Sequence, residues 1–262
     1  MGILTFIGLG LNDERGISIR GLEEARNADF VFAEFYTSLM PNLSMPNLEK
    51  LIGKPVTVLS RHDVEENARQ IILDKVKDGR TVFLVPGDPM IATTHIDLRL
   101  RAERLGIDTR IIGAASIQTA AAAITGLQSY KFGRTITLPL TATTSPESPY
   151  HHLKTNRKAG LHTLILLDLH AEKRQYMTIP EGIRYLLEVE NRRKEKVFED
   201  TTLAIGVARA GADDVAVKAA AAASLEKLDF GPAPHSLIVP GELHFMEMEA
   251  LKVFARAEDV AG

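Results

Sequence analysis

The sequence predicts two α/β domains, and three observations lead to this prediction. Of the 262 residues, 45% are hydrophobic, which is enough for a substantial buried core. Residues 82–85 are Val-Phe-Leu-Val, a run without polar alternation that is typical of a strand buried on both faces of a parallel sheet. Strand-like and helix-like segments alternate through the first half of the chain, which favours a parallel sheet covered by helices.

The first half of the chain contains most of these alternating elements. Ser18 is the expected N-cap of a helix that runs to about residue 28. Asp63 and Glu66 indicate a capping box for the next helix, and Gly79 is expected to end that helix in a left-handed conformation. We predict strands at residues 4–7, 30–33, 81–85 and 109–112, helices at 18–28, 63–79 and 116–124, and a further helix that ends near residue 105.

The second half has a different order of elements. The segment 126–133 is bounded by glycines and polar at its centre, so we predict a connector there and domains at 1–128 and 129–262. Alanine clusters at 120–123 and 219–223 are interpreted as sites of close helix packing. We predict strands at residues 135–140, 163–169, 203–208 and 236–239, and helices at 180–190 and 242–255.

Charge and cysteine content exclude several classes of protein. The net charge is -3, from 31 basic and 34 acidic residues, so no general nucleic-acid-binding surface is expected. The chain has no cysteine, which excludes disulfides and thiolate chemistry and is compatible with the cytoplasm. No apolar run approaches the ~20 residues that span a bilayer, so no membrane association is expected.

The loop at residues 86–95, Pro-Gly-Asp-Pro-Met-Ile-Ala-Thr-Thr-His, is the main candidate for ligand binding. In open α/β sheets, ligands bind beyond the carboxyl ends of the strands. Two prolines stiffen this loop and Gly87 permits a backbone conformation closed to other residues, so Asp88 is presented in one place. A plain turn in which Asp88 caps the next helix fits the loop equally well when the loop is taken alone.

Other common site motifs are incomplete or absent. The glycines at residues 8–13 follow the first strand, but Asp13 stands where the dinucleotide fingerprint has its third glycine. No glycine-rich loop leads into the Lys-Ser or Lys-Thr of a P-loop, no hydrolase triad is indicated, and the histidines lack paired metal-ligand spacing. The basic cluster at 191–196 is interpreted as a solvated helix end in preference to a docking patch.

Eight strings, taken together and in order, resemble one protein family. They are Gly-Leu-Gly-Leu at 8–11, Ala-Glu-Phe-Tyr-Thr-Ser at 33–38, the loop at 86–95, Tyr-Lys-Phe-Gly at 130–133, Leu-His-Thr-Leu at 161–164, Asp-Leu-His-Ala-Glu-Lys at 168–173, Ala-Arg-Ala-Gly at 208–211 and Pro-His-Ser-Leu-Ile-Val-Pro-Gly at 234–241. They resemble the diphthine synthase family of diphthamide biosynthesis, a branch of the tetrapyrrole methylase-like class III methyltransferases. The resemblance extends from about Leu4 to Glu247, and residues 141–150 depart from the family pattern.

The resemblance implies a two-domain fold with a cofactor cleft between the domains, where S-adenosyl-L-methionine binds. It implies a protein substrate, translation elongation factor 2, whose 3-carboxy-3-aminopropyl histidine is methylated on the amino group to give diphthine. Similarity to two-domain relatives also suggests a homodimer, while the lack of cysteine favours the cytoplasm and the histidine spacing predicts no metal site. The implied cofactor contacts are Leu11, Asp88, Ile91, Ser116, Ile117, Leu167, Ala210 and His235.

The catalytic residue is left unassigned. Methyl transfer from a sulfonium to an amine creates little new charge, so alignment and water exclusion are expected to dominate. The amine must first lose a proton, and water, Asp88 or His235 are the acceptors considered. Two alternatives are a tetrapyrrole methyltransferase, which would need basic groups for several propionates, and a binding protein on the same fold without turnover.

Overall fold

The computed structural model describes residues 2–140 and 145–257, which divide into two compact units, residues 1–117 and 118–262. This division lies earlier in the chain than the one expected from the sequence, which follows residue 128. Helix α6 (Ile117–Thr125) falls before that point, yet a Cβ atom on Gly126 would lie only 2.5 Å from the Cβ of Ala250 in the second unit. The end of α6 therefore packs with the second unit. Of the divergent segment 141–150, residues 141–144 lie outside the described part.

The first unit contains a five-stranded sheet in which every pairing is parallel, in the order β3-β2-β4-β1-β5. This arrangement confirms the α/β prediction for this half. The strands are β1 (Ile3–Gly8), β2 (Phe30–Glu34), β3 (Thr57–Leu59), β4 (Thr81–Val85) and β5 (Asp108–Ile112). The helices are α1 (Ile19–Asn27), α2 (Met45–Ile52), α3 (Arg61–Glu65), α4 (Asp74–Asp78) and α5 (His95–Arg104).

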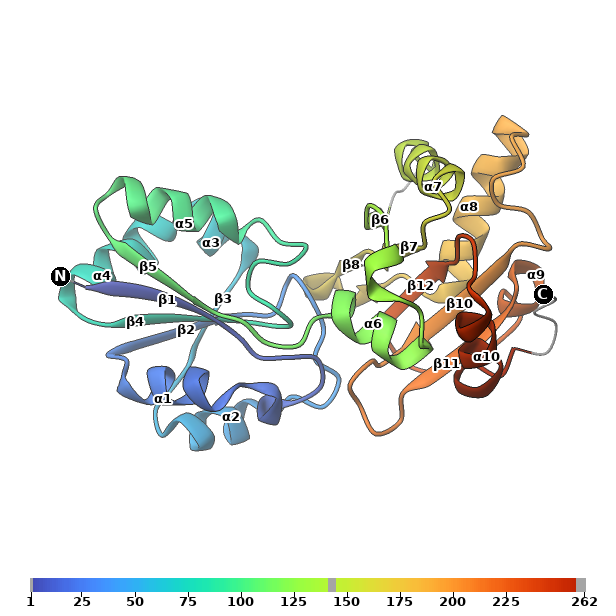
Figure 1. The fold of residues 1–262 in the computed structure, drawn as a ribbon. Coiled ribbons are helices and arrows are strands. Elements are labelled where there is room, and N and C mark those ends of the chain that lie inside the picture. Colours follow the sequence, from blue (N-terminus) through green and yellow to red (C-terminus); the bar gives the residue numbers. More distant parts are fainter. Residues whose placement is uncertain (1, 141–144, 258–262) are drawn as a thin grey trace. The chain divides into compact units, whose positions relative to one another are not determined.

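Helices cover both faces of this sheet, as the unbroken apolar strand at 81–85 indicated. Figure 1 shows α1 and α2 on one face and α3, α4 and α5 on the other. Alternate residues of β4 enter the two cores, since Phe83 packs with the α3–α5 side and Leu84 with the α1–α2 side. Because both faces are buried, the remaining free part of the sheet is the edge formed by its strand ends.

The predicted helix at 63–79 is broken into shorter pieces, and two details of that prediction were wrong. The capping box is formed by Ser60 and Asp63, not by Asp63 and Glu66. Gly79 has a φ of 174°, an extended conformation that any residue adopts, so it does not end the helix as a left-handed residue. A Cβ atom on Gly79 would collide with the carboxylate of Asp29, so close packing explains this glycine.

The second unit contains a mixed sheet in the order β11-β10-β12-β7-β6, in which only β6 and β7 pair in parallel. Figure 1 shows α7, α8 and α9 on one face of this sheet and α6 and α10 on the other. The strands are β6 (Ile136–Leu138), β7 (Thr163–Leu167), β8 (Leu169–His170), β9 (Gln175–Tyr176), β10 (Leu203–Ala208), β11 (Ala216–Ala221) and β12 (His235–Val239). The helices besides α6 are α7 (Ser148–Lys158), α8 (Ile179–Arg193), α9 (Ala222–Leu225) and α10 (Phe245–Phe254).

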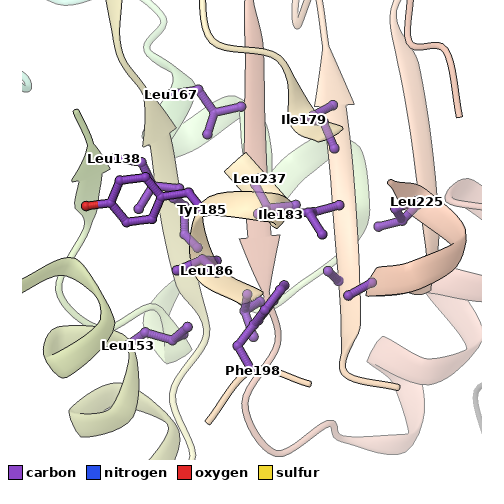
Figure 2. Packing of buried hydrophobic residues seen from close by; sticks show 14 of the residues in the cluster. Leu138, Leu153, Leu167, Ile179, Ile183, Tyr185, Leu186, Phe198, Leu225 and Leu237 are labelled. Atoms are coloured by element: carbon purple, nitrogen blue, oxygen red, sulfur yellow. The ribbon is translucent and has the colours of Figure 1, made fainter. Parts of the chain in front are cut away.

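Helix α8 supplies much of the core of the second unit. Its start is fixed by a capping box between Thr178 and Glu181, which satisfies two backbone N–H groups of the first turn. Figure 2 shows Ile183 and Leu186 of this helix in the same buried cluster as Leu237 of β12. Helix propensity alone would not hold α8 in place, so this apolar face joins it to the sheet.

The alanine cluster at 219–223 was wrongly interpreted as a helix-packing site. Its first part belongs to β11, which pairs with β10 in an antiparallel register that places Ala219 opposite Ile205. The short helix α9 begins only at Ala222. Pairing with a neighbouring strand has overridden the weak preference of alanine for strands. Among the residues that the structure describes, no helix is long and apolar enough to cross a membrane.

The carboxylate of Glu190 makes the stability of the second unit depend on pH. Burial alone would raise the pKa of Glu190. The carboxylate accepts hydrogen bonds from the backbone N–H of Phe198, from the Tyr150 hydroxyl at 2.7 Å and from two further N–H groups, and these bonds lower the pKa to about 2. Because the folded pKa lies below the unfolded value, the contribution is present above pH ~4.5 and is lost as the pH falls toward 2.

We expect protonation of Glu190 to lower the free energy of unfolding by about 3 kcal/mol as the pH decreases from 5 to 2. Urea unfolding followed by far-UV circular dichroism at several pH values measures this slope. Glu190→Gln removes the titrating group, so the variant should show a shallower slope. Equal slopes in the two proteins would contradict the assignment.

Candidate functional site

The loops after β1 and β4 are joined at the carboxyl edge of the first sheet. Leu9 donates its N–H to the carbonyl of Val85 at 2.8 Å. Beyond this bond, Gly10 and Gly87 exchange two backbone hydrogen bonds of 3.2 and 2.7 Å. An antiparallel bridge therefore joins the two loops directly beyond the parallel ladder of β1 and β4.

Glycines allow the two backbones to approach. A Cβ atom on Gly8 would lie 2.5 Å from the carbonyl oxygen of Gly87, so no larger residue fits at position 8 without a shift. Gly87 has a φ of 69°, a conformation that favours glycine. A Cβ atom on Gly87 would meet no atom of the described residues within 4 Å. One side of the backbone at Gly87 is therefore open to a ligand.

Asp88 ties this edge to the loop after β5. Its Oδ1 accepts the N–H of Met90 at 3.0 Å, and its Oδ2 accepts the N–H of Ala114 at 3.3 Å. A Cβ atom on Gly113 would lie 2.7 Å from the same Oδ2, so the carboxylate rests against this glycine. The N-cap of α5 is Thr94. Asp88 thus connects two loops and does not cap the next helix.

The five expected contact residues of the first unit all come shortly after a strand in the sequence, and each of these strands ends at this edge of the sheet. Leu11 follows β1, Asp88 and Ile91 follow β4, and Ser116 and Ile117 follow β5. Ile91 is 36% exposed, and its N–H bonds to the carbonyl of Asp88 at 3.3 Å. Ser116 is buried directly before α6. The fold therefore gathers these five residues on the loops of one sheet edge.

The other three expected contacts lie at one edge of the second sheet. Leu167 ends β7, Ala210 follows β10, and His235 begins β12. Because β12 runs antiparallel between β10 and β7, its first residue lies beside their last residues. All three side chains are less than one tenth exposed.

The imidazole of His235 is held by the protein on both sides. Its Nδ1 accepts the N–H of Ile179 at 3.3 Å, and its Nε2 lies 3.1 Å from the carbonyl oxygen of Gly231 and 3.2 Å from that of Pro232. Since a carbonyl only accepts, the proton is on Nε2. Burial lowers the pKa of His235, so the ring is neutral. In this arrangement no lone pair of the ring is left for a substrate proton.

Two further groups shape these edges: the sequence did not point to the Gly113-Ala114 pair, and it placed Arg209 in the string at 208–211 without giving it a role. The Asp88 carboxylate lies against Gly113 and accepts the N–H of Ala114. In the sequence, two small residues directly after a strand are the only sign of this contact. Arg209 is buried with a φ of 52° and donates to the carbonyls of Phe230 and Pro232 at 2.6 and 2.8 Å. Arg209 therefore anchors the segment before His235.

Comparison with known proteins identifies the family. The family model for tetrapyrrole (corrin/porphyrin) methylases matches residues 3–226. A diphthine synthase of Methanocella arvoryzae is 48% identical over 262 residues, covering 99% of this chain and 98% of the relative. The chain belongs to the diphthine synthase family. A Methanosarcina acetivorans diphthine synthase is 50% identical over 255 residues, covering 95% and 94% of the two chains. A crystal structure of diphthine synthase matches with a TM-score of 0.87 and 41% identity, over 97% of this chain and 96% of that one.

Membership of the diphthine synthase family confirms two expectations drawn from the sequence. The fold is that of the tetrapyrrole methylases, and the chain is a methyltransferase. The assignment of individual contact residues stays a prediction. The loops described above place Asp88 and its partners where an open α/β sheet binds ligands.

We expect Gly113→Ala to disturb the candidate ligand site through Asp88. The added methyl group would lie 2.7 Å from Oδ2 of Asp88 and must displace that carboxylate. Binding of S-adenosylhomocysteine, measured by calorimetry, should weaken by about tenfold, which is the effect of losing one net hydrogen bond.

Gly53→Ala is the matched control for this variant. Gly53 ends α2 with a φ of 83°, so alanine there strains the backbone without touching the Asp88 loops. The control should lower the urea midpoint but leave the affinity unchanged. Equal affinities in Gly113→Ala and the wild type would contradict the role given to this contact.

Proposed function

We propose that this chain transfers methyl groups from S-adenosyl-L-methionine to the amino group of the 3-carboxy-3-aminopropyl histidine of translation elongation factor 2, giving diphthine. The observation that carries the proposal is the identity of 48% to a diphthine synthase over nearly the whole of both chains. At this level of identity and coverage, all the loops described above fall within the aligned region.

We infer that the strand-end residues described above are the cofactor contacts, each group taken by itself. In the first group, Leu11 and Ile91 are apolar, and the exposed backbone face of Gly87 suits close approach of a ligand. The second group, Leu167, Ala210 and His235, is small or apolar apart from its histidine. A donor set of backbone groups and apolar side chains fits an adenosine and a sulfonium methyl group.

S-adenosyl-L-methionine, when bound, supplies an electrophilic methyl group. Asp88 and the loops it joins would hold the cofactor so that its methyl group is transferred to the amine nitrogen, with the sulfur released as a neutral thioether and the positive charge left on nitrogen. The chain itself needs to align the amine and exclude water, an effect worth up to roughly 7 to 11 kcal/mol in favourable models. The loops that Asp88 holds in place supply the fixed geometry that alignment requires.

The amine loses its proton before each attack. His235 is a poor acceptor for it because both of its ring nitrogens bond to protein groups. Each carboxylate oxygen of Asp88 accepts one N–H and keeps a second lone pair. We therefore propose water, or Asp88 through water, as the proton acceptor.

We propose that the enzyme works in the cytoplasm as a homodimer and docks elongation factor 2 as a folded protein substrate. The absence of cysteine from the sequence is compatible with a reducing compartment. Sedimentation velocity of the purified chain tests the dimer directly.

Mass spectrometry of the protein substrate tests the proposed reaction. Elongation factor 2 that carries the aminocarboxypropyl histidine is incubated with the chain and S-adenosyl-L-methionine, and a gain of one to three methyl groups is expected. Elongation factor 2 with unmodified histidine is the matched control and should gain none. Cofactor binding without methyl transfer to either form would reject the proposed acceptor.

A further inference from the structure

Glu34, Tyr36 and His95 form a buried polar cluster at the carboxyl edge of the first sheet. Glu34 ends β2, which lies beside β4, and His95 is the first residue of α5. Their exposed fractions are 0%, 6% and 1% respectively. Burial of three polar side chains in one place is costly unless they have a structural or functional task, and the reaction described above uses none of them.

Glu34 fixes the turn that carries Tyr36. Its Oε2 accepts the N–H groups of Tyr36 and Thr37 at 2.9 and 3.0 Å, and its Oε1 accepts the Thr37 hydroxyl. The ring of Tyr36 then meets the imidazole of His95 edge to face, with centroids 6.3 Å apart. Phe83 contacts the same imidazole, at 5.2 Å. The two aromatic rings hold the imidazole in one orientation.

In this orientation the imidazole reaches the loop after β4. Nδ1 of His95 lies 3.4 Å from the carbonyl oxygen of Pro89, and because a carbonyl only accepts, the proton is on Nδ1. Nε2 has no hydrogen-bond partner among the described residues, and 3.6 Å separates it from Oε1 of Glu34. Burial lowers the pKa of His95 to about 4, so the ring is neutral at neutral pH.

We propose that His95 is a positioning residue, which holds the loop at 86–94 through the hydrogen bond from its Nδ1–H to the carbonyl of Pro89. Pro89 directly follows Asp88, so this bond fixes the chain on one side of Asp88 while the bond to Ala114 fixes the carboxylate. Glu34 and Tyr36 act through His95 by keeping its ring in place. This inference deepens the proposed function and rests on it.

A matched pair of variants separates the two ring nitrogens. The amide nitrogen of asparagine falls near the position of Nδ1, and that of glutamine falls near Nε2. We expect His95→Asn to bind S-adenosylhomocysteine within about threefold of the wild type and His95→Gln to bind about tenfold more weakly, as the loss of one net hydrogen bond predicts. In turnover, His95→Gln should raise KM for the cofactor by the same factor, with a smaller change in kcat.

Two readouts keep this test independent of folding and of the proposed function. Urea midpoints of both variants show whether they are compared at equal stability, and equal affinities at equal stability would overturn the positioning role. In the wild type, the ¹⁵N chemical shifts of the His95 ring should report a neutral ring with its proton on Nδ1, and a proton on Nε2 would overturn the proposal. A wild type with this tautomer that fails to bind the cofactor would instead reject the proposed function.

Discussion

Replacing Asp88 by alanine is expected to weaken cofactor binding by about hundredfold. The substitution removes the acceptors for the N–H groups of Met90 and Ala114 and so releases the loops after β4 and β5 from each other. Two hydrogen bonds to a charged group are together worth about 3 kcal/mol, which corresponds to this factor. Calorimetry with S-adenosylhomocysteine measures the affinity, and mass spectrometry of elongation factor 2 measures methyl transfer.

Asp97→Ala is the matched control for Asp88→Ala. Asp97 lies on α5, is paired with Arg101 at 2.9 Å, and its side chain is 64% exposed. Removing such a surface pair changes the free energy of unfolding by only about 0–1 kcal/mol. Asp97→Ala should therefore bind the cofactor like the wild type. If Asp88→Ala also does so while remaining folded, Asp88 is not part of the binding site.

Replacing Glu247 by alanine is expected to destabilise the second unit by about 3–5 kcal/mol. Glu247 is 1% exposed and bonds to Nε2 of His162 at 2.8 Å, to Nζ of Lys131 at 2.6 Å, and to the backbone N–H groups of Gln128 and His244. Alanine would leave the N–H groups of Gln128 and His244 and the ring of His162 without this acceptor, and Lys131 would keep only the carbonyl of Glu242. The chain has no tryptophan, so far-UV circular dichroism in urea is the suitable measurement.

Glu249→Ala on the same helix is the control for this variant. Glu249 pairs with Lys252 at 3.2 Å, and both side chains are largely exposed. Its removal should cost about 1 kcal/mol or less. Similar losses for Glu247→Ala and Glu249→Ala would show that the buried network adds nothing to stability.

The pH dependence gives a second check on Glu247. Burial alone would raise its pKa, but hydrogen bonds from Lys131 and from backbone N–H groups lower it to about 2. The folded pKa lies below the unfolded one, so this contribution is present above pH ~4.5 and decreases as the pH falls toward 2. The difference in stability between wild type and Glu247→Ala should therefore shrink on acidification.

Local patterns were enough to predict most of the strands. The strands at 81–85 and 203–208 have the predicted bounds, because continuous apolar runs between turn residues leave few other interpretations. The division of residues 61–78 into α3, a π-helical turn at Arg69–Leu73 and α4 was not predicted. Apolar spacing alone does not distinguish one helix from three short segments that bury the same face.

The candidate site could be predicted only as a set of loops. The Pro-Gly-Asp-Pro string identified Asp88, but its partner Ala114 lies 26 residues further along the chain. Only the order of the strands brings these two loops together. In the same way, the sequence could not show that both ring nitrogens of His235 are bonded, since Gly231 and Ile179 approach the ring from different segments.

The exchange of hydrogen bonds between Gly10 and Gly87 has a consequence for the dynamics of the enzyme. Because this bridge lies directly beyond the ends of β1 and β4, two inner strands of the sheet, we expect the loop amides to open together with those strand ends. Amide hydrogens at Gly10 and Gly87 should therefore exchange about as slowly as those of the central strands and not at the rate of surface loops. The two bridged loops are then already ordered before a ligand binds. The conformational entropy of ordering these loops is therefore lost during folding and not during binding.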